Sequence, residues 1–167
     1  MEKKMIFLSG PRQVGKTTFA KSLQSFFQNS IYLNYDAEED RNIIDRKSWS
    51  AHLDLIILDE IHKKRNWKNY LKGLFDTKPK NLKILVTGSA RLETFRKGGD
   101  SLTGRYFSLR MMPLSPRELK LDKINTNMED LLARGGFPEP FFAESSIDRD
   151  RWRNQYMDTM VRQDVLD

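Results

Sequence analysis

The stretch Met5-Ile-Phe-Leu-Ser-Gly-Pro-Arg-Gln-Val-Gly-Lys-Thr-Thr18 decides the fold. It opens with a short apolar run, Met5–Leu8, of the kind that forms a strand buried on both faces. The next residues, Gly10–Thr17, match the pattern G-x-x-x-x-G-K-[ST], and a helical pattern follows directly. Strand, glycine-containing loop and helix together predict a phosphate-binding loop, because curled backbone N–H groups and a helix N-terminus both attract an anion.

Within this loop each residue type has an expected task. The two glycines, Gly10 and Gly15, let the backbone curl around a phosphate, Lys16 is expected to reach the outer phosphates, and the Thr17 hydroxyl is expected to ligate Mg²⁺. The alternative is that these residues form only a turn and the start of a helix. The predicted nucleotide contacts are Gly10, Pro11, Arg12, Gln13, Val14, Gly15, Lys16, Thr17 and Thr18.

Short apolar runs alternate with helical patterns along most of the chain, which is typical of an α/β protein with a parallel sheet. The strands are expected at Met5–Leu8, Ile31–Tyr35, Leu53–Leu58, Leu82–Thr87 and Arg105–Met111. Helices are expected at Lys16–Gln28, around Trp67–Phe75, and from Ser115 onward with that serine as N-cap, whereas Ala37–Asp45 is a short helix or a loop. We predict a core over residues 1–120 and a helical extension over 121–167, with a turn at Gly135–Pro140 inside the extension. No capping residue ends the last predicted helix, which suggests that the natural protein is longer.

Two carboxylates follow the most apolar strand. Asp59 and Glu60 leave the run that ends at Leu58, and a carboxylate at that position can ligate Mg²⁺ beside a phosphate loop. We therefore predict Asp59 as a metal ligand together with Thr17, and Glu60 as the general base that polarises an attacking water. The alternative is a strand end with solvated acids.

Further polar residues follow the later strands. Ser89, with Thr87 as the alternate, is predicted to orient the water or contact the γ-phosphate, although Thr-Gly-Ser is also a common turn sequence. Arg91 and Arg105 are candidates for stabilising charge on a transferred phosphoryl group, although most such arginines are simply surface residues.

The composition bears on metal, nucleic-acid and membrane binding. The 167 residues contain no cysteine and two histidines, which excludes disulfides and thiolate chemistry and argues against a zinc site. The net charge of +6 permits a nucleic-acid partner, but the positive residues are scattered rather than clustered. With neither a long apolar segment nor a signal peptide, the sequence predicts a soluble, cytoplasmic protein without a membrane partner.

Five segments resemble prokaryotic AAA-type ATPases whose ATPase domain precedes an uncharacterised C-terminal domain. The matching segments are Gly10–Thr18, Leu58–His62, Thr87–Ala90, Leu102–Arg105 and Gly135–Pro138. The resemblance implies an ASCE-type P-loop NTPase fold, a three-layer sandwich around a mainly parallel five-stranded sheet, in which the Thr87 strand lies between the strands of the phosphate loop and of Asp59. A helical C-terminal segment follows.

The same resemblance implies ATP with Mg²⁺ and assigns roles to individual residues. Lys16 carries over as the loop lysine, Thr17 and Asp59 as metal ligands, Glu60 as the water-activating acid, and Ser89 as a polar sensor. Arg105 matches a Gly-Arg of the family and is a candidate arginine finger, which leaves a homo-oligomer open. Members of the family are usually several hundred residues long and have a helical segment before the first strand. This chain shows neither feature.

Three functions are consistent with these residues. The first is an ATPase whose hydrolysis rearranges an assembly or a missing C-terminal domain, and the second is a nucleotide-gated binding module with little turnover. The third, a P-loop kinase, predicts an arginine-rich lid and no Asp-Glu pair. A GTPase is disfavoured because the sequence lacks the Asn-Lys-x-Asp motif that reads guanine.

Overall fold

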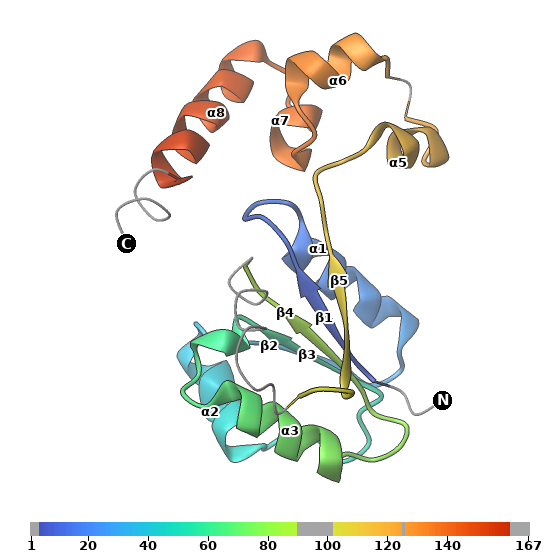
Figure 1. Ribbon diagram of the computed structural model, residues 1–167, viewed down its shortest axis with the longest axis vertical. Coiled ribbons are helices and arrows are strands. Elements are labelled where there is room, and N and C mark those ends of the chain that lie inside the picture. The colour runs from blue at the N-terminus through green and yellow to red at the C-terminus, as the bar shows by residue number, and fades with distance from the viewer. Residues whose placement is uncertain (1–3, 90–101, 125, 161–167) are drawn as a thin grey trace. The chain divides into compact units, whose positions relative to one another are not determined.

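A computed structural model of the protein describes residues 4–89, 102–124 and 126–160 and divides into two compact units, Met1–Met111 and Met112–Asp167 (Figure 1). The first unit contains β1 (Met5–Ser9), α1 (Lys16–Ser22), a 3₁₀ helix (Leu23–Phe26), β2 (Ser30–Asn34), α2 (Glu38–Arg46), β3 (Leu55–Asp59), a second 3₁₀ helix (Ile61–Lys63), α3 (Trp67–Thr77), β4 (Lys83–Thr87) and β5 (Tyr106–Arg110). The second contains α5 (Pro116–Leu121), α6 (Met128–Arg134), α7 (Pro138–Phe142) and α8 (Ser146–Met160). The division falls earlier in the chain than the predicted boundary at residue 120.

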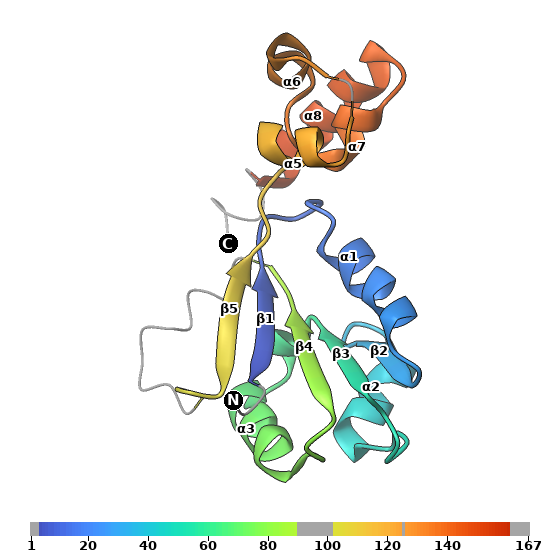
Figure 2. The same ribbon diagram turned by 90° about the vertical axis from the view of Figure 1, so that its right-hand side faces the viewer.

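The five strands form one sheet in the order β2-β3-β4-β1-β5, and every pair is parallel. The expected α/β class and parallel sheet are therefore confirmed. The insertion of β4 between β1 and β3 is also confirmed, since β4 pairs with both. Because all strands run the same way, their carboxyl ends lie along one edge, where ligands of open α/β sheets usually bind (Figure 2).

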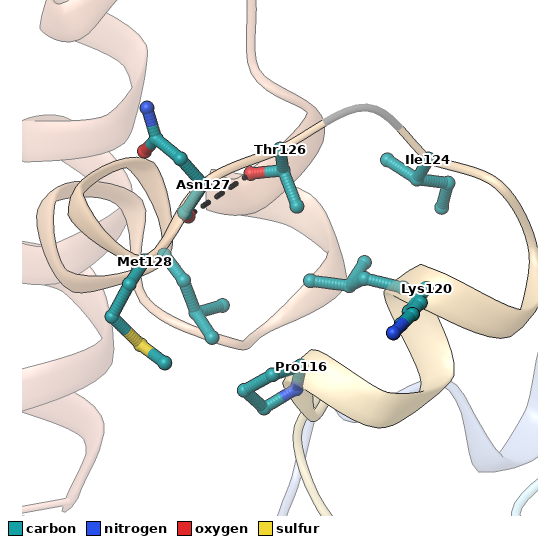
Figure 3. A pocket seen from close by; sticks show the side chains of 8 residues that line it. Pro116, Lys120, Ile124, Thr126, Asn127 and Met128 are labelled. Carbon is teal, nitrogen blue, oxygen red and sulfur yellow. Dashed lines mark hydrogen bonds between the residues drawn. The ribbon is translucent and has the colours of Figure 1, made fainter.

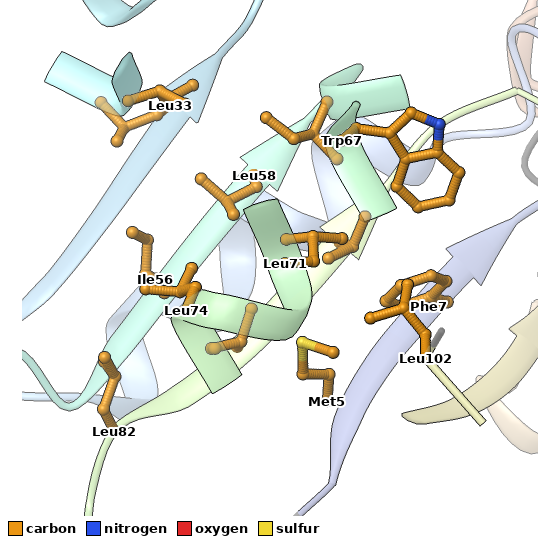
Figure 4. Close-up of a cluster of buried hydrophobic side chains, with 14 of the residues drawn as sticks. Met5, Phe7, Leu33, Ile56, Leu58, Trp67, Leu71, Leu74, Leu82 and Leu102 are labelled. Carbon is orange, nitrogen blue, oxygen red and sulfur yellow. The ribbon is translucent and has the colours of Figure 1, made fainter. Parts of the chain in front are cut away.

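Helices cover both faces of this sheet, which gives three layers. On one face α2 and α3 contribute Ile44, Leu71 and Leu74 to the larger apolar cluster, together with strand residues such as Ile56 and Leu58 (Figure 4). On the other face α1 packs a smaller cluster. Its buried members are Leu8, Ala20, Leu55, Ile57 and Leu85. The strand residues therefore alternate between two cores, which explains why β3 is buried along its whole length.

The helix after the phosphate loop is shorter than the predicted Lys16–Gln28. It ends at Ser22, and a 3₁₀ turn follows in which Ser22 and Ser25 donate their hydroxyls to backbone carbonyls three residues earlier, each at 2.8 Å. Such local bonds tighten the last turn of a helix. Phe26, at the end of this turn, is 78% exposed.

The second unit is helical, as expected. The predicted N-cap Ser115 is confirmed and forms a capping box with Glu118. The predicted turn at Gly135–Pro140 is wrong in its second half, because α7 starts at Pro138, and proline is well suited to the first turn of a helix. A mostly apolar hollow lies beside α5 (Figure 3); its described lining residues are Pro116, Leu119, Lys120, Ile124, Thr126, Asn127, Met128 and Leu131.

None of the helices in the described ranges combines the length and the hydropathy needed to cross a lipid bilayer.

Candidate functional site

The predicted phosphate loop leaves the carboxyl end of β1 and requires glycine at two points. Gly10 has a φ of +150°, and a methyl group there would lie 2.3 Å from the carbonyl oxygen of Met111. Gly15 has a φ of +98° and caps α1, so the helix N-terminus opens directly at the loop. The backbone conformation is therefore the one that the glycines of the motif were expected to permit.

Lys16 is buried in the loop, with 9% of its surface exposed. Its Nζ donates hydrogen bonds to the carbonyl oxygens of Gly10, at 3.1 Å, and Pro11, at 2.5 Å. Burial lowers the pKa of Lys16 below its ordinary value of 10.5, an effect that the carboxylates of Glu60 and Asp59 oppose. A buried ammonium with two carbonyl acceptors is well placed to exchange them for phosphate oxygens, which pair more strongly with a cation.

Asp59 is the centre of the site. It is 4% exposed at the end of β3 and lies opposite Thr87 in the register between β3 and β4. Thr87 donates its hydroxyl to Oδ1 at 2.5 Å, Thr17 donates to Oδ2 at 3.0 Å, and the backbone N–H of Glu60 donates to Oδ1 at 3.1 Å. The structure thus brings the two predicted metal ligands, Thr17 and Asp59, into direct contact.

Tyr32 is a residue of the site that sequence reasoning missed. It lies on β2, and its hydroxyl donates to Oδ2 of Asp59 at 2.5 Å. Burial, followed by the hydrogen bond to the carboxylate, raises the pKa of Tyr32 well above its ordinary value, so the phenol stays a donor at neutral pH. The apolar run Ile31–Leu33 gave no sign of this, because the contact depends on how β2 pairs with β3.

Glu60 leaves the sheet in a left-handed conformation, with a φ of +55°. Its N–H also donates to the carbonyl oxygen of Thr87 at 3.1 Å, which ties this turn to β4. The half-buried carboxylate lies 3.5 Å from Nε2 of His62 and 3.6 Å from Nζ of Lys63. A non-glycine residue in this conformation is strained, and such strain is found preferentially at functional positions.

The remaining predicted residues are placed elsewhere. In β4 it is the alternate, Thr87, whose hydroxyl reaches Asp59, whereas Ser89 lies two residues further along, half-buried. Arg105 precedes β5 at the amino edge of the sheet, opposite to the phosphate loop, and its guanidinium pairs with Asp76 at 2.9 and 3.2 Å. Its own chain therefore does not bring Arg105 to the loop. Arg91 lies outside the described residues.

The donor atoms present suit magnesium with a nucleotide. The described residues contain no cluster of three or more His, Cys, Asp or Glu side chains that could hold a metal by themselves. Mg²⁺ usually binds through one or two carboxylates, with phosphate oxygens and water completing its shell. The hydroxyl of Thr17 lies beside the carboxylate of Asp59, next to the loop lysine, and these two groups are donors that could hold such an ion.

A family model described as an AAA domain matches residues 2–120, which is most of the chain. The chain belongs to the AAA domain family. The match covers the whole sheet and every site residue described above, and membership indicates a nucleotide-binding, ATPase-like P-loop domain. The parallel five-stranded sheet with helices on both faces is the architecture expected of such a domain.

The chain is also similar to curated proteins whose function is not stated. This AAA domain is 27% identical over 168 residues to an uncharacterised protein of Mycobacterium bovis and to one of Mycobacterium tuberculosis, covering 96% of this chain and 36% of each relative. An uncharacterised protein of Haemophilus influenzae is 24% identical over 189 residues, covering 95% of this chain and 45% of the relative. The chain thus spans less than half the length of these relatives.

Proposed function

We propose that this AAA domain binds ATP with Mg²⁺ and hydrolyses it to ADP and phosphate. The observation that carries the proposal is the buried carboxylate of Asp59, which contacts Thr17 of the phosphate loop and is followed directly by Glu60. Lys16 would hold the outer phosphates, and Thr17 and Asp59 would hold Mg²⁺. The metal, when bound, neutralises charge that develops on the phosphate oxygens.

Glu60 is the proposed general base. A carboxylate beside the metal ligand can accept a proton from a water that attacks the γ-phosphate, and general-base catalysis contributes about 10²–10⁴-fold to a rate. Ser89 is the proposed residue that orients this water, because it follows β4 at the same carboxyl edge. Nζ of Lys63 lies 2.5 Å from Oδ2 of Asp36 but 3.6 Å from Oε2 of Glu60, so its closer ion pair is with Asp36 and the Glu60 carboxylate stays able to accept a proton.

A second candidate function is a nucleotide-gated binding module with little turnover. The observation that favours it is the same ion pair: with Lys63 at 3.6 Å, the Glu60 carboxylate has a cation beside it that competes with a proton from water. Under this alternative ATP binding changes the affinity for a partner, and hydrolysis only resets the state.

Replacing Glu60 by Gln separates the two functions. Under the ATPase proposal, steady-state phosphate release falls about 100-fold or more while ATP affinity stays within a few fold, because the amide keeps the size but loses the base. Glu39→Gln, an exposed acid on α2, is the matched control. Phosphate release that is already at background in the unchanged chain, with ATP binding intact, would support the binding module instead.

We further propose that hydrolysis rearranges either a homo-oligomer or the part of a longer protein that corresponds to the remainder of the relatives. In the first case Arg105 would act as an arginine finger on a neighbouring copy. The measurement is the mass in solution with and without ATP and Mg²⁺. A monomer in both conditions would remove the role of Arg105 as an arginine finger in this chain.

We also propose a cytoplasmic location, which the absence of cysteine supports.

A further inference from the structure

Tyr32 reaches the site from a strand that the phosphate-loop motif does not include. In the parallel register Tyr32 pairs with Ile57, two residues before Asp59 on β3. Residues two apart on a strand share a face, so Tyr32, Ile57 and Asp59 all lie on the face that α1 covers. The length of the tyrosine side chain spans the remaining distance along the strand, and its hydroxyl ends 2.5 Å from Oδ2 of Asp59.

The Asp59 carboxylate is consequently held from both of its neighbouring strands. Thr87 on β4 donates to Oδ1 and Tyr32 on β2 donates to Oδ2, each at 2.5 Å. Because these two side chains reach different oxygens from strands on opposite sides of β3, they oppose rotation of the carboxylate about its Cβ–Cγ bond. Thr17 then finds Oδ2 already oriented, at 3.0 Å.

The tyrosine ring is itself fixed in place. Nζ of Lys21 on α1 lies 4.8 Å from the ring centroid, over its face, and the ring packs against the apolar cluster beneath α1. A donor on a ring held in this way has little freedom to swing out when the site fills. Tyr32 therefore has the features of a rigid support for a metal ligand.

We propose that Tyr32 is a positioning residue for magnesium, whose hydroxyl holds the Asp59 carboxylate in the orientation that binds the metal of a Mg²⁺–ATP complex. This inference rests on the proposed function and adds to it a residue on β2. Partners that orient a metal ligand typically change metal affinity or activity by about 10–100-fold when they are removed. The two groups that interact with the Tyr32 hydroxyl, the Asp59 carboxylate and the Thr17 side chain, are the two proposed metal ligands, so we expect its effect mainly on the metal-dependent part of nucleotide binding.

The test compares the affinity of the full chain for a fluorescent ATP analogue in Mg²⁺ and in EDTA, and takes the ratio of the two. In Tyr32→Phe the affinity in EDTA stays as in the unchanged chain, and the gain due to Mg²⁺ falls about 10-fold. Tyr70→Phe is the matched control, because this half-buried tyrosine donates to the carbonyl oxygen of Ile44 at 2.8 Å, away from Asp59. Its ratio stays unchanged.

The outcomes separate the two levels of the proposal. An unchanged ratio in Tyr32→Phe overturns the role of Tyr32 alone, and so does an equal loss of affinity in both buffers, which marks general damage to the site. An unchanged chain that binds no nucleotide in either buffer, or gains nothing from Mg²⁺, overturns the proposed function as well. Thermal unfolding of each variant verifies that the comparison is made on folded protein.

Discussion

The two edges of the sheet each hold a carboxylate with donated hydrogen bonds, but in opposite surroundings. At the carboxyl edge Asp59 is 4% exposed and its partner Thr87 is fully buried. At the amino edge Asp76 is exposed, and the side chain of its partner Arg105 is 29% exposed. From this contrast we expect burial, more than the number of hydrogen bonds, to set how strongly a polar contact stabilises this protein.

The largest effect on the free energy of unfolding is expected from Gly10→Ala at the carboxyl edge. The added methyl would lie 2.3 Å from the Met111 carbonyl oxygen, and the φ of +150° is unfavourable for alanine, so we expect a loss of about 3 kcal/mol together with loss of nucleotide binding. Chemical denaturation measures the first and analogue fluorescence the second.

Gly73→Ala is the matched control for that variant. Gly73 lies within α3, and a methyl there has nothing within 4 Å, so stability should rise by about 0.5–1 kcal/mol. If both alanines changed stability alike, the close approach at Gly10 would not be the cause.

Thr87→Val is expected to have the next largest effect. The change keeps the shape but removes a hydroxyl that the buried Asp59 accepts, which should lower the free energy of unfolding by about 2 kcal/mol. Thr77→Val removes an exposed hydroxyl that donates to the Gly73 carbonyl and should change stability much less. Urea denaturation of both variants tests this contrast, and equal losses would contradict the importance given to burial.

Lys16→Met should shift stability less, and in the opposite direction, while removing nucleotide binding. The folded chain disfavours the charged ammonium, so the pKa of Lys16 lies below 10.5 and the unfolded chain binds more protons between the two values. Stability contributed by this residue therefore rises with pH as 10.5 is approached. We expect Lys16→Met to be more stable than the unchanged chain at neutral pH, with the gap narrowing at alkaline pH.

Denaturation across pH provides the measurement for Lys16, and Lys80→Met, an exposed lysine, is its control. A gap that widens with rising pH would show that the lysine is not penalised by burial.

The smallest effect is expected from Arg105→Ala at the amino edge. The hydrogen bonds from Arg105 lower the pKa of Asp76 below its ordinary value of 3.8, so the pair stabilises the fold above pH 3.8 and that stabilisation disappears as the pH falls through the lowered value. Because Asp76 is exposed and Arg105 is partly exposed, solvent screens the ion pair, and the unfolding midpoint at pH 7 should stay within experimental error. A clear drop in the unfolding midpoint of Arg105→Ala at pH 7 would contradict the expectation that the contact at the amino edge stabilises the fold less than the contacts at the carboxyl edge.

Much of the fold follows from local pattern. A run such as Leu55–Leu58 is apolar at every position, which is typical of a strand buried on both faces, and all five predicted strands are present. The phosphate loop could be located because its motif requires glycine and lysine within a few residues. The end of α1 could not, since the bonds of Ser22 and Ser25 to nearby carbonyls compete with the apolar pattern.

Candidate site residues could be proposed from the sequence where a short motif contains them. The residues of the loop and the pair Asp59–Glu60 were proposed from their order, and the structure brings Thr17 into contact with Asp59. That Thr87, and not Ser89, contacts Asp59 depends on the register between β3 and β4, and the position of Arg105 depends on which end of β5 it precedes. Neither is visible in a local pattern.

Local residue patterns were enough to predict a phosphate loop between a buried strand and a helix, and an acidic pair after another buried strand, because these features need only short-range residue types. No such pattern predicts that the carboxylate of Asp59 is held between Thr87 and Tyr32, which follows from the way the strands pair. The physical reason is that strand order, register and face arise from pairing between segments far apart in the chain, and a shift of one residue would turn each side chain to the other face.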